Sequence, residues 1–354
     1  MLAGPRAQFS FALMALLSPA LCAGADIPAS QPADAKPFIG LLLPLNAPDF
    51  ARPAEAVRSG CQAALRFVES RPPLQVMSTD AQSESIIAQY EAAVQRGAAV
   101  MVGPLTRSGV TALASTGRVN VATLALNVAE GGLLPPRLYT FGLSVEPEAR
   151  LVARIAFARG LRNAAVVEAA TLLARRVSRA FADEWFSLGG RIGDVREFGP
   201  QTNWVELRER FADSDAQFVF LAAEADQART VRPYLNNQIP VFATSQINDG
   251  RSDPITNGDL NGIRFVDMPW LVQPDHPAVM VYPRPDHLSV ELQRFYALGI
   301  DACRIAGELL AGHDRIRLDG VTGRISLRGG NALEREPVQA VFREGAGTSI
   351  EDQR

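Results

Sequence analysis

The sequence predicts an α/β protein with two lobes, each built on a parallel β-sheet flanked by helices, and three observations support this fold class. Short apolar runs, typical of strands buried on both faces of a sheet, alternate with longer amphipathic stretches, typical of helices. The chain has 354 residues, 47% of them hydrophobic, which is enough for about two domains. The alternation breaks near residues 141–144 and then starts again, which predicts a second lobe.

Residues 1–25 have the features of a secretory signal peptide. Arg6 and the amino terminus supply positive charge, and residues 9–17 form an apolar run that is too short to span a bilayer. Ala23, Gly24 and Ala25 then offer a cleavage site. We therefore expect an exported mature chain that starts with a linker at residues 26–37, and we find no later run apolar enough for a membrane helix.

The βαβ unit at residues 97–127 is the best-defined part of the first lobe. Gly103 and Pro104 end its first strand, and the hydroxyl of Thr106 or Ser108 can cap the helix that follows. The strands expected before the break lie at 38–45, 74–78, 98–102 and 119–126, the helices at 55–69 and 84–96, and a loop with two prolines at 46–53.

The same alternation predicts the second lobe and the segment that follows it. Its expected helices lie at 148–159, 172–188, 204–213 and 225–235, and its strands at 163–168, 191–198, 217–222, 240–244 and 263–267. Residues 289–310 are predicted to form two helical pieces around Gly299. A turn at 320–323 then precedes a late strand at 324–327.

Polar residues at the ends of the predicted strands are the candidates for a ligand cleft, because open parallel sheets bind ligands at the carboxyl ends of their strands. They are Asn46, Thr106, Ser108, Asn127, Ser144, Thr244 and Ser245. Backbone N–H groups at the helix start near residues 106–108 suit a carboxylate or another anion. The same hydroxyl groups suit helix caps and tight turns, so this alternative stays open.

The sequence gives no support for catalysis, metal binding or nucleic-acid binding. The three histidines, His276, His287 and His313, have no metal-ligand spacing, and we find no nucleophile elbow, H-E-x-x-H motif or phosphate-binding loop. The net charge is −3, and the arginines are scattered without interleaved aromatic residues. We therefore expect no catalytic residue, no metal, no cofactor and no nucleic-acid partner.

Three further residues have two interpretations. Cys61 and Cys303 fall on apolar helix faces, which favours small buried thiols, although an oxidising compartment permits a disulfide. Trp270 lies beside a proline-rich loop and either packs between elements or anchors a partner, since Trp is enriched at binding hot spots. For Trp270 the packing interpretation is favoured.

Eight motifs, in this order, resemble the LppC family, whose members are periplasmic activators of bifunctional penicillin-binding proteins. They are GLLLPL (40–45), VGPL (102–105), ATLALN (122–127), YTFGLSVEPEAR (139–150), IPVFATSQI (239–247), DLNGIRFVDMPW (259–270), ALGIDA (297–302) and DGVTGRISL (319–327). The resemblance covers residues 39–345 and implies the two-lobed fold of type I periplasmic binding proteins, with about three crossovers that act as a hinge. The first lobe would comprise residues 38–142 and about 276–328, and the second residues 143–275 and about 329–354.

The resemblance also implies a function. It indicates a non-enzymatic regulator of peptidoglycan synthesis in the periplasm, whose partner is a bifunctional penicillin-binding protein and whose membrane contact is at most a lipid anchor on Cys22 at the outer membrane. The sequence before Cys22 matches the lipidation pattern poorly, so loss of Cys22 with the signal is the alternative. The family's best-known members carry a long N-terminal helical repeat domain, which this sequence does not show.

The alternative function is a solute-binding protein of an uptake transporter, with an amino-acid-like or amide ligand in the cleft. Amino-acid receptors of this fold hold the ligand carboxylate with small hydroxyl residues after the strand that corresponds to residues 98–102. Leu105 and Arg107 interrupt that pattern here, which argues against a standard amino-acid pocket.

Overall fold

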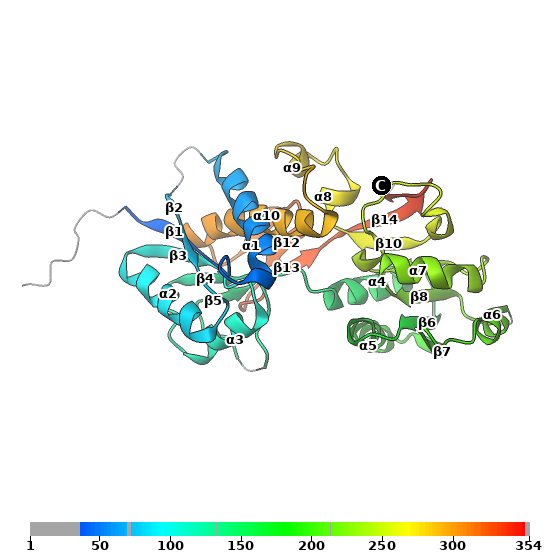
Figure 1. Ribbon diagram of the computed structural model, residues 1–354. Coiled ribbons are helices and arrows are strands. Elements are labelled where there is room, and N and C mark those ends of the chain that lie inside the picture. Colours follow the sequence, from blue (N-terminus) through cyan, green and yellow to red (C-terminus); the bar gives the residue numbers. More distant parts are fainter. Residues whose placement is uncertain (1–35, 69–71, 132, 213, 351–354) are drawn as a thin grey trace, which may run out of the picture. The chain divides into compact units, whose positions relative to one another are not determined.

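The computed structural model describes residues 36–350 apart from 69–71, 132 and 213 (Figure 1). The predicted signal peptide, Cys22 and all but the end of the predicted linker lie outside the described residues. The chain from Lys36 onward forms one packed unit. None of the described helices combines the length and apolar character that a membrane span requires.

The first sheet contains five parallel strands in the order β2-β1-β3-β4-β5. Alternate residues of β1 point to opposite faces: Leu41 packs on one face with the core of α1 and α10, and Leu42 on the other with that of α2 and α3. The strands are β1 (Phe38–Leu43), β2 (Leu74–Ser78), β3 (Ala98–Val102), β4 (Ala122–Ala125) and β5 (Leu138–Thr140). The helices are α1 (Pro48–Leu65), α2 (Ser83–Gln95), α3 (Arg107–Ser115) and α10 (Val290–Leu310).

The second sheet contains seven strands in the order β15-β14-β10-β9-β8-β6-β7, and β6 to β10 are parallel as predicted. These are β6 (Asn163–Ala169), β7 (Arg191–Phe198), β8 (Phe218–Ala222), β9 (Val241–Ala243) and β10 (Arg264–Asp267). Its helices are α4 (Glu146–Ala158), α5 (Leu172–Ser187), α6 (Trp204–Ala212) and α7 (Ala225–Val231), which a short 3-10 helix at Arg232–Tyr234 follows.

Two strands of the second sheet, β14 (Val338–Arg343) and β15 (Ala346–Ser349), were not predicted and run antiparallel. They form a hairpin whose two-residue turn, Glu344 and Gly345, has positive φ at both positions, the geometry that suits the twist of paired strands. The second sheet is therefore mixed, with β14 and β15 added beside its parallel strands.

The chain crosses between the lobes three times: from β5 to α4, from β10 to α8 (Pro269–Val272), and from β13 to β14. A small antiparallel sheet of β11 (Ile316–Asp319), β12 (Arg324–Leu327) and β13 (Glu334–Glu336) precedes the last crossing. Its residues Ile325 and Leu327 belong to the core of the first lobe. This arrangement confirms the predicted two-lobed type I periplasmic-binding-protein fold with several crossovers.

Two predictions for the helices of the first lobe were wrong. The segment predicted as a loop at 46–53 contains the start of α1, because Pro48 occupies the first turn, where its missing N–H costs no hydrogen bond. The helix α10 is continuous through Gly299 instead of broken into two pieces. A β-carbon at Gly299 would collide with the backbone oxygen of Val57, so glycine is needed here for the close approach of α1 and not for a break.

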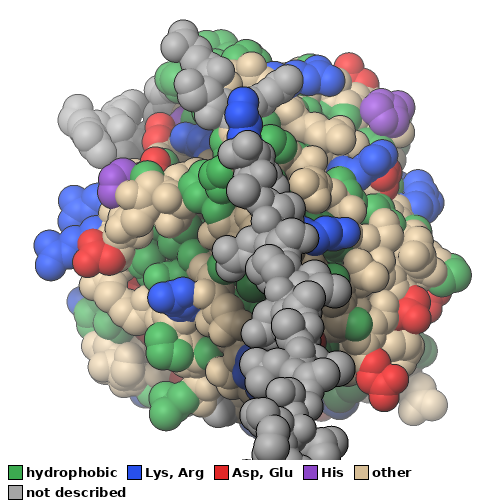
Figure 2. Space-filling view, turned by 90° about the vertical axis from the view of Figure 1, so that its left-hand side faces the viewer, with side chains coloured by type: hydrophobic (Ala, Val, Ile, Leu, Met, Phe, Trp, Pro, Cys, Tyr) green, Lys and Arg blue, Asp and Glu red, His purple; other side chains and the backbone are tan. Residues whose placement is uncertain are grey.

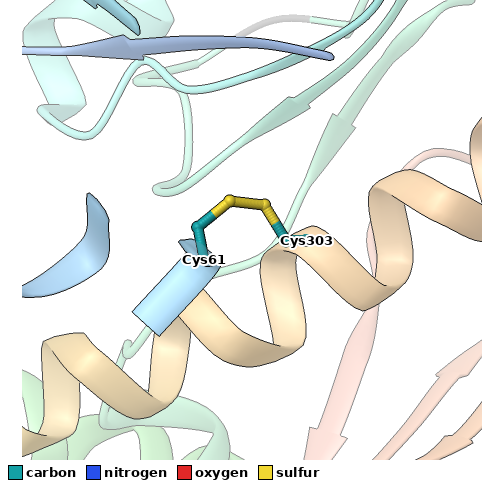
Figure 3. Close-up of a disulfide and its surroundings, with 2 residues drawn as sticks. All are labelled: Cys61 and Cys303. Carbon is teal, nitrogen blue, oxygen red and sulfur yellow. A yellow bond between two sulfur atoms is a disulfide. The ribbon is translucent and has the colours of Figure 1, made fainter. Parts of the chain in front are cut away.

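The prediction of free thiols at Cys61 and Cys303 was also wrong, because the two residues form a disulfide that joins α1 to α10 (Figure 3). Their Cα atoms are 5.2 Å apart. Gly60 makes this proximity possible, since a β-carbon there would collide with the backbone oxygen of Tyr296 on α10. The apolar helix faces were predicted correctly, but they face each other closely enough for the sulfur atoms to bond.

Candidate functional site

A cavity of about 250 Å³ lies between the two lobes, at the carboxyl ends of the first sheet's strands. The first lobe contributes the loops after β3 and β4 and one face of α10. The first crossing, the start of α4 and the start of α5 close the other side. The lining residues are Leu105, Arg107, Leu126, Asn127, Leu143, Ser144, Val145, Glu146, Leu173, Arg176, Phe295 and Leu298.

Two of the seven predicted cleft residues, Asn127 and Ser144, line this cavity. The Asn127 side chain is fixed by its own loop: its amide donates to the Leu105 carbonyl at 3.2 Å, and its oxygen accepts from the Val128 N–H at 3.0 Å. The structure therefore brings the ends of β4 and β5 together, as the parallel sheet predicts.

The predicted residues Thr106, Ser108 and Asn46 do not line the cavity. Thr106 is buried and caps α3, since its hydroxyl accepts from the Gly109 N–H at 3.2 Å. This hydrogen bond already satisfies one of the N–H groups that we expected to face an anion. Ser108 and Asn46 are exposed. Thr106 is therefore a helix cap, the alternative that the sequence analysis left open.

Thr244 and Ser245 lie at the end of β9 and are both buried, but away from the cavity. Thr244 lines a separate pocket of only about 10 Å³. Ser245 begins the 3-10 turn η2 (Ser245–Ile247), and its N–H donates to the Glu148 carboxylate at 3.0 Å. Its carbonyl accepts from Arg294 of α10 at 3.1 Å, and this second bond connects Ser245 to the first lobe.

The cavity wall is mostly apolar, with one unbalanced positive charge. Arg176 and Glu146 neutralise each other through an ion pair of 3.0 Å. Within the described part of the chain, the guanidinium of Arg107 has no hydrogen-bond or ion-pair partner. Such a site suits a small ligand with one acidic group and an apolar body.

A group of buried charged residues that the sequence analysis did not identify surrounds the three crossings. Glu148, at the start of α4, is 3% exposed and accepts from Arg335 of β13 at 2.7 Å as well as from Ser245. The Arg335 side chain, 7% exposed, also donates to the Thr322 carbonyl at 3.3 Å. This ion pair joins the first crossing to the third.

A second buried ion pair joins α10 to the second crossing. Arg294 of α10 binds both oxygens of the fully buried Asp267, at 2.5 and 3.0 Å. The same guanidinium donates to the carbonyls of Ser245 and Asn248, and the Asn248 amide donates to Asp267 at 2.8 Å. Each charge is matched by an opposite charge and by hydrogen bonds, which is the condition for keeping an ion pair inside a protein.

Asp301 is the third buried acid, further along α10. Its carboxylate accepts from the N–H groups of Val321 and Thr322, at 3.1 and 2.8 Å, and from the Thr322 hydroxyl at 2.7 Å. Burial raises the pKa of Asp301, while Arg304 and the hydrogen bonds oppose the shift. Asp301 thus anchors the loop between β11 and β12 on α10.

Trp270 does not reach the surface. Its ring is fully buried, packs against Tyr296 with ring centres 5.4 Å apart, and has the guanidinium of Arg284 above it at 4.5 Å. Its indole N–H donates to Gln293 at 3.3 Å. A ring without exposed surface is not available to a partner in this structure, so the packing interpretation of Trp270 holds.

On the visible part of the face in Figure 2, Lys and Arg side chains lie among hydrophobic and acidic side chains. In the described ranges, no three His, Cys, Asp or Glu residues come together as a potential metal site. The inter-lobe cavity and the buried charges around the crossings are thus the two features on which a function can be argued.

Comparison with known proteins identifies relatives along nearly the whole described chain. The model of the family described as LppC putative lipoprotein matches residues 33–345. The protein named penicillin-binding protein activator LpoA from Photobacterium profundum is 27% identical over 348 residues, which cover 86% of this chain and 55% of that protein. The chain thus spans about half the length of the curated relatives it matches.

Two solved structures are similar over most of the chain. The C-domain of LpoA from Haemophilus influenzae, described as a regulator of PBP1A, is 25% identical with a TM-score of 0.74, and the match covers 88% of this chain and 99% of that domain. A protein from Chromobacterium violaceum, described as a putative branched-chain amino acid ABC transporter, is 37% identical with a TM-score of 0.75. That match covers 87% of this chain and all of the other.

Proposed function

Because the chain belongs to the LppC putative lipoprotein family, we propose that it is a periplasmic regulator that binds a bifunctional penicillin-binding protein and activates its peptidoglycan synthesis. The observation that carries the proposal is the match to 99% of the LpoA C-domain, which is itself described as a regulator of PBP1A. Curated relatives named penicillin-binding protein activators support the same function. In this proposal the protein acts by contact and not by catalysis.

The proposed location follows from the family and the N-terminal sequence. A signal peptide would direct the chain to the periplasm. Cleavage before Cys22 would leave this residue for lipid attachment at the outer membrane, whereas cleavage after residue 25 would remove it. The lobe bounds expected above, residues 38–142 with about 276–328 and residues 143–275 with about 329–354, enter this proposal with one change. The crossings follow Asp267 and Glu336, so Trp270 and Leu333 belong to the core of the first lobe. The partner would then meet a protein whose two lobes are joined by three crossings.

A second candidate function, solute binding, is favoured by the cavity. Arg107 supplies an unbalanced positive charge among apolar walls, and Asn127 and Ser144 supply polar groups at the same place. The Chromobacterium violaceum protein, described as a putative branched-chain amino acid ABC transporter, supports this candidate through its 37% identity. The ligand would be a small acid with an apolar body, since Leu105 and Arg107 stand where small hydroxyl residues are expected in an amino-acid pocket.

Two assays on the same purified protein separate the candidates. In the first, glycan polymerisation and cross-linking by a bifunctional penicillin-binding protein from the same cells are measured with and without the protein. We expect the protein to raise the rate. In the second, thermal unfolding is followed against a panel that includes the branched-chain amino acids and their 2-keto acids. A true ligand at a hundredfold excess over Kd would add about 2.7 kcal/mol to the free energy of unfolding.

The variant Arg107→Ala is the matched control for the second assay. It removes the unpaired charge from the cavity, so it should abolish a ligand-induced melting shift while the effect on the synthase stays the same. Suppose that one acid raises the melting temperature, that Arg107→Ala removes this increase, and that the protein does not change synthase activity. This combination would favour the solute-binding function over the regulator function. No effect in either assay would contradict both candidates.

A further inference from the structure

The three crossings between the lobes each have a buried polar group of the protein beside them. Glu148 follows the first crossing at the start of α4, Asp267 ends β10 at the second, and Arg335 of β13 precedes the third. Glu148 and Asp267 are 3% and 0% exposed. Burying a carboxylate costs free energy. The presence of buried carboxylates beside the crossings, where a hinge motion would bend the chain, therefore needs an explanation.

Five hydrogen bonds and one stretch of α10 connect Glu148 and Arg335 into a closed circuit that runs through both lobes. Starting at Glu148, it passes to the backbone of Ser245 (3.0 Å), from there to Arg294 (3.1 Å), and along α10 to Asp301. It continues from Asp301 to Thr322 (2.7 Å), from Thr322 to Arg335 (3.3 Å) and back to Glu148 (2.7 Å). We call these six residues the crossing circuit.

The crossing circuit connects elements that a hinge motion would move relative to one another. Glu148 and Ser245 belong to elements of the second lobe, while Arg294 and Asp301 lie on α10, which packs in the core of the first. Arg294 also holds Asp267 at the second crossing. A rotation of the lobes would separate at least one buried carboxylate from its guanidinium, and an unpaired buried charge is strongly disfavoured.

The cavity is not needed to complete the circuit. None of the six residues lines it, and each charged member finds its partners within the chain. In a protein that closes on a solute, contacts with the bound solute are what favour the closed form. In this chain, side chains of the protein itself bridge the lobes.

We propose that the crossing circuit holds the two lobes at one fixed opening, whether or not a molecule occupies the cavity. This inference goes beyond the proposed function, because it concerns how the molecule is held and not what it binds. Its consequence is that any partner meets a surface composed of both lobes in one preset arrangement. Opening and closing would then require loss of the buried ion pairs.

Pulsed electron paramagnetic resonance between two spin labels tests the proposal. The labels are attached to Glu91→Cys on α2 and Asp183→Cys on α5, two exposed positions in different lobes, in a Cys22→Ser chain whose remaining cysteines form the disulfide. We expect a single narrow distance distribution that the panel of acids and amino acids used above does not change. The same measurement is then made on Arg335→Met, on Glu148→Gln and on the control Arg328→Met, an exposed arginine of the loop after β12.

The expected result is loss of the single narrow peak in Arg335→Met and Glu148→Gln but not in Arg328→Met. Hydrogen exchange in the centre of both sheets should stay slow in the two circuit variants, which shows that the lobes themselves are intact. If Arg335→Met does not fold, Glu148→Gln decides, because it keeps the shape of the side chain and one oxygen acceptor. Three results would overturn the proposal. The first is a broad distance distribution in the protein with an intact circuit, and the second is a change in the label distance on adding any of the acids or amino acids. The third is a narrow distance peak in circuit variants that have folded.

Discussion

The two lobes share the same alternation of strands and helices but fill their cores by different means. In the first lobe, Gly60 and Gly299 let α1 and α10 approach until backbone atoms nearly touch, and a disulfide joins the two helices. In the second lobe, aromatic side chains fill the core. Phe181 stacks on Phe220 with ring centres 4.1 Å apart and lies beside Trp185. The packing of the first core depends on the short distance between α1 and α10, and the packing of the second core depends on the volume of its aromatic side chains.

The difference shows that the two lobes of one fold can be packed in different ways, and that each kind of packing is sensitive to a different kind of substitution. A core built by close helix approach has no flexible side chain that can adapt when an atom is added. A core built from rings can adapt, but it leaves a large void when a ring is removed. Added atoms should therefore damage the first lobe, and removed atoms the second.

The largest effect is expected from the disulfide. Because Cys61 and Cys303 are 242 positions apart, the cross-link restricts the unfolded chain strongly, and its removal in Cys61→Ala with Cys303→Ala should lower the free energy of unfolding by about 5 kcal/mol. Urea unfolding of the oxidised protein and of the double variant measures the loss. A reducing agent should lower the stability of the parent protein and leave the double variant unchanged. Equal stability of the two proteins would show that helix contact alone holds the first lobe.

The next effect is expected from the aromatic core of the second lobe. Phe181→Ala removes a fully buried ring from between Phe220 and Trp185, and a void of that size should cost about 4 kcal/mol. Phe186→Ala on the same helix is the matched control, since Phe186 is 56% exposed and should change stability by no more than about 0.5 kcal/mol. Chemical unfolding followed by tryptophan fluorescence compares them, and similar losses in both would contradict a ring-dependent core.

The smallest effect tests the close approach of the helices directly. Gly60→Ala places a methyl group against the backbone oxygen of Tyr296, and forcing α1 away from α10 should cost about 2 kcal/mol. Gly307→Ala is the control on α10: no atom lies within 4 Å of its β-carbon position, so it should gain about 0.8 kcal/mol from helix propensity alone. Thermal unfolding measures both, and a gain in both variants would show that the helices can separate freely.

Most elements could be predicted from the sequence because their patterns are local. β3 is a wholly apolar run that Gly103 ends, and both bounds were predicted correctly. The pairing of Cys61 with Cys303 could not be predicted, because it depends on how two distant helices meet. β14 and β15 were missed because Glu344-Gly345 is not one of the usual dipeptides of a two-residue hairpin turn. Nothing local indicates that a hairpin joins a parallel sheet either.

The candidate site was predicted only in part. The strand-end rule placed Asn127 and Ser144 at the cavity, but it could not tell that Thr106 caps a helix instead. The acids of the crossing circuit were missed because Asp and Glu are almost never fully buried, so patterns assign them to the surface. The available signal was a single acid within an apolar stretch, as at Asp301 between Ile300 and Ala302.

The discontinuity of the first lobe has a consequence for the order of folding. The five parallel strands of the second lobe lie within Asn163–Asp267, so they pair at moderate sequence separation. In contrast, α1 can pack only after α10, far along the chain, has been synthesised. Closing so long a loop carries a high entropic cost and delays the contact. The half that is synthesised first is thus completed last. Until α10 is synthesised, the apolar face of α1 has no helix to cover it and Cys61 has no partner for its disulfide.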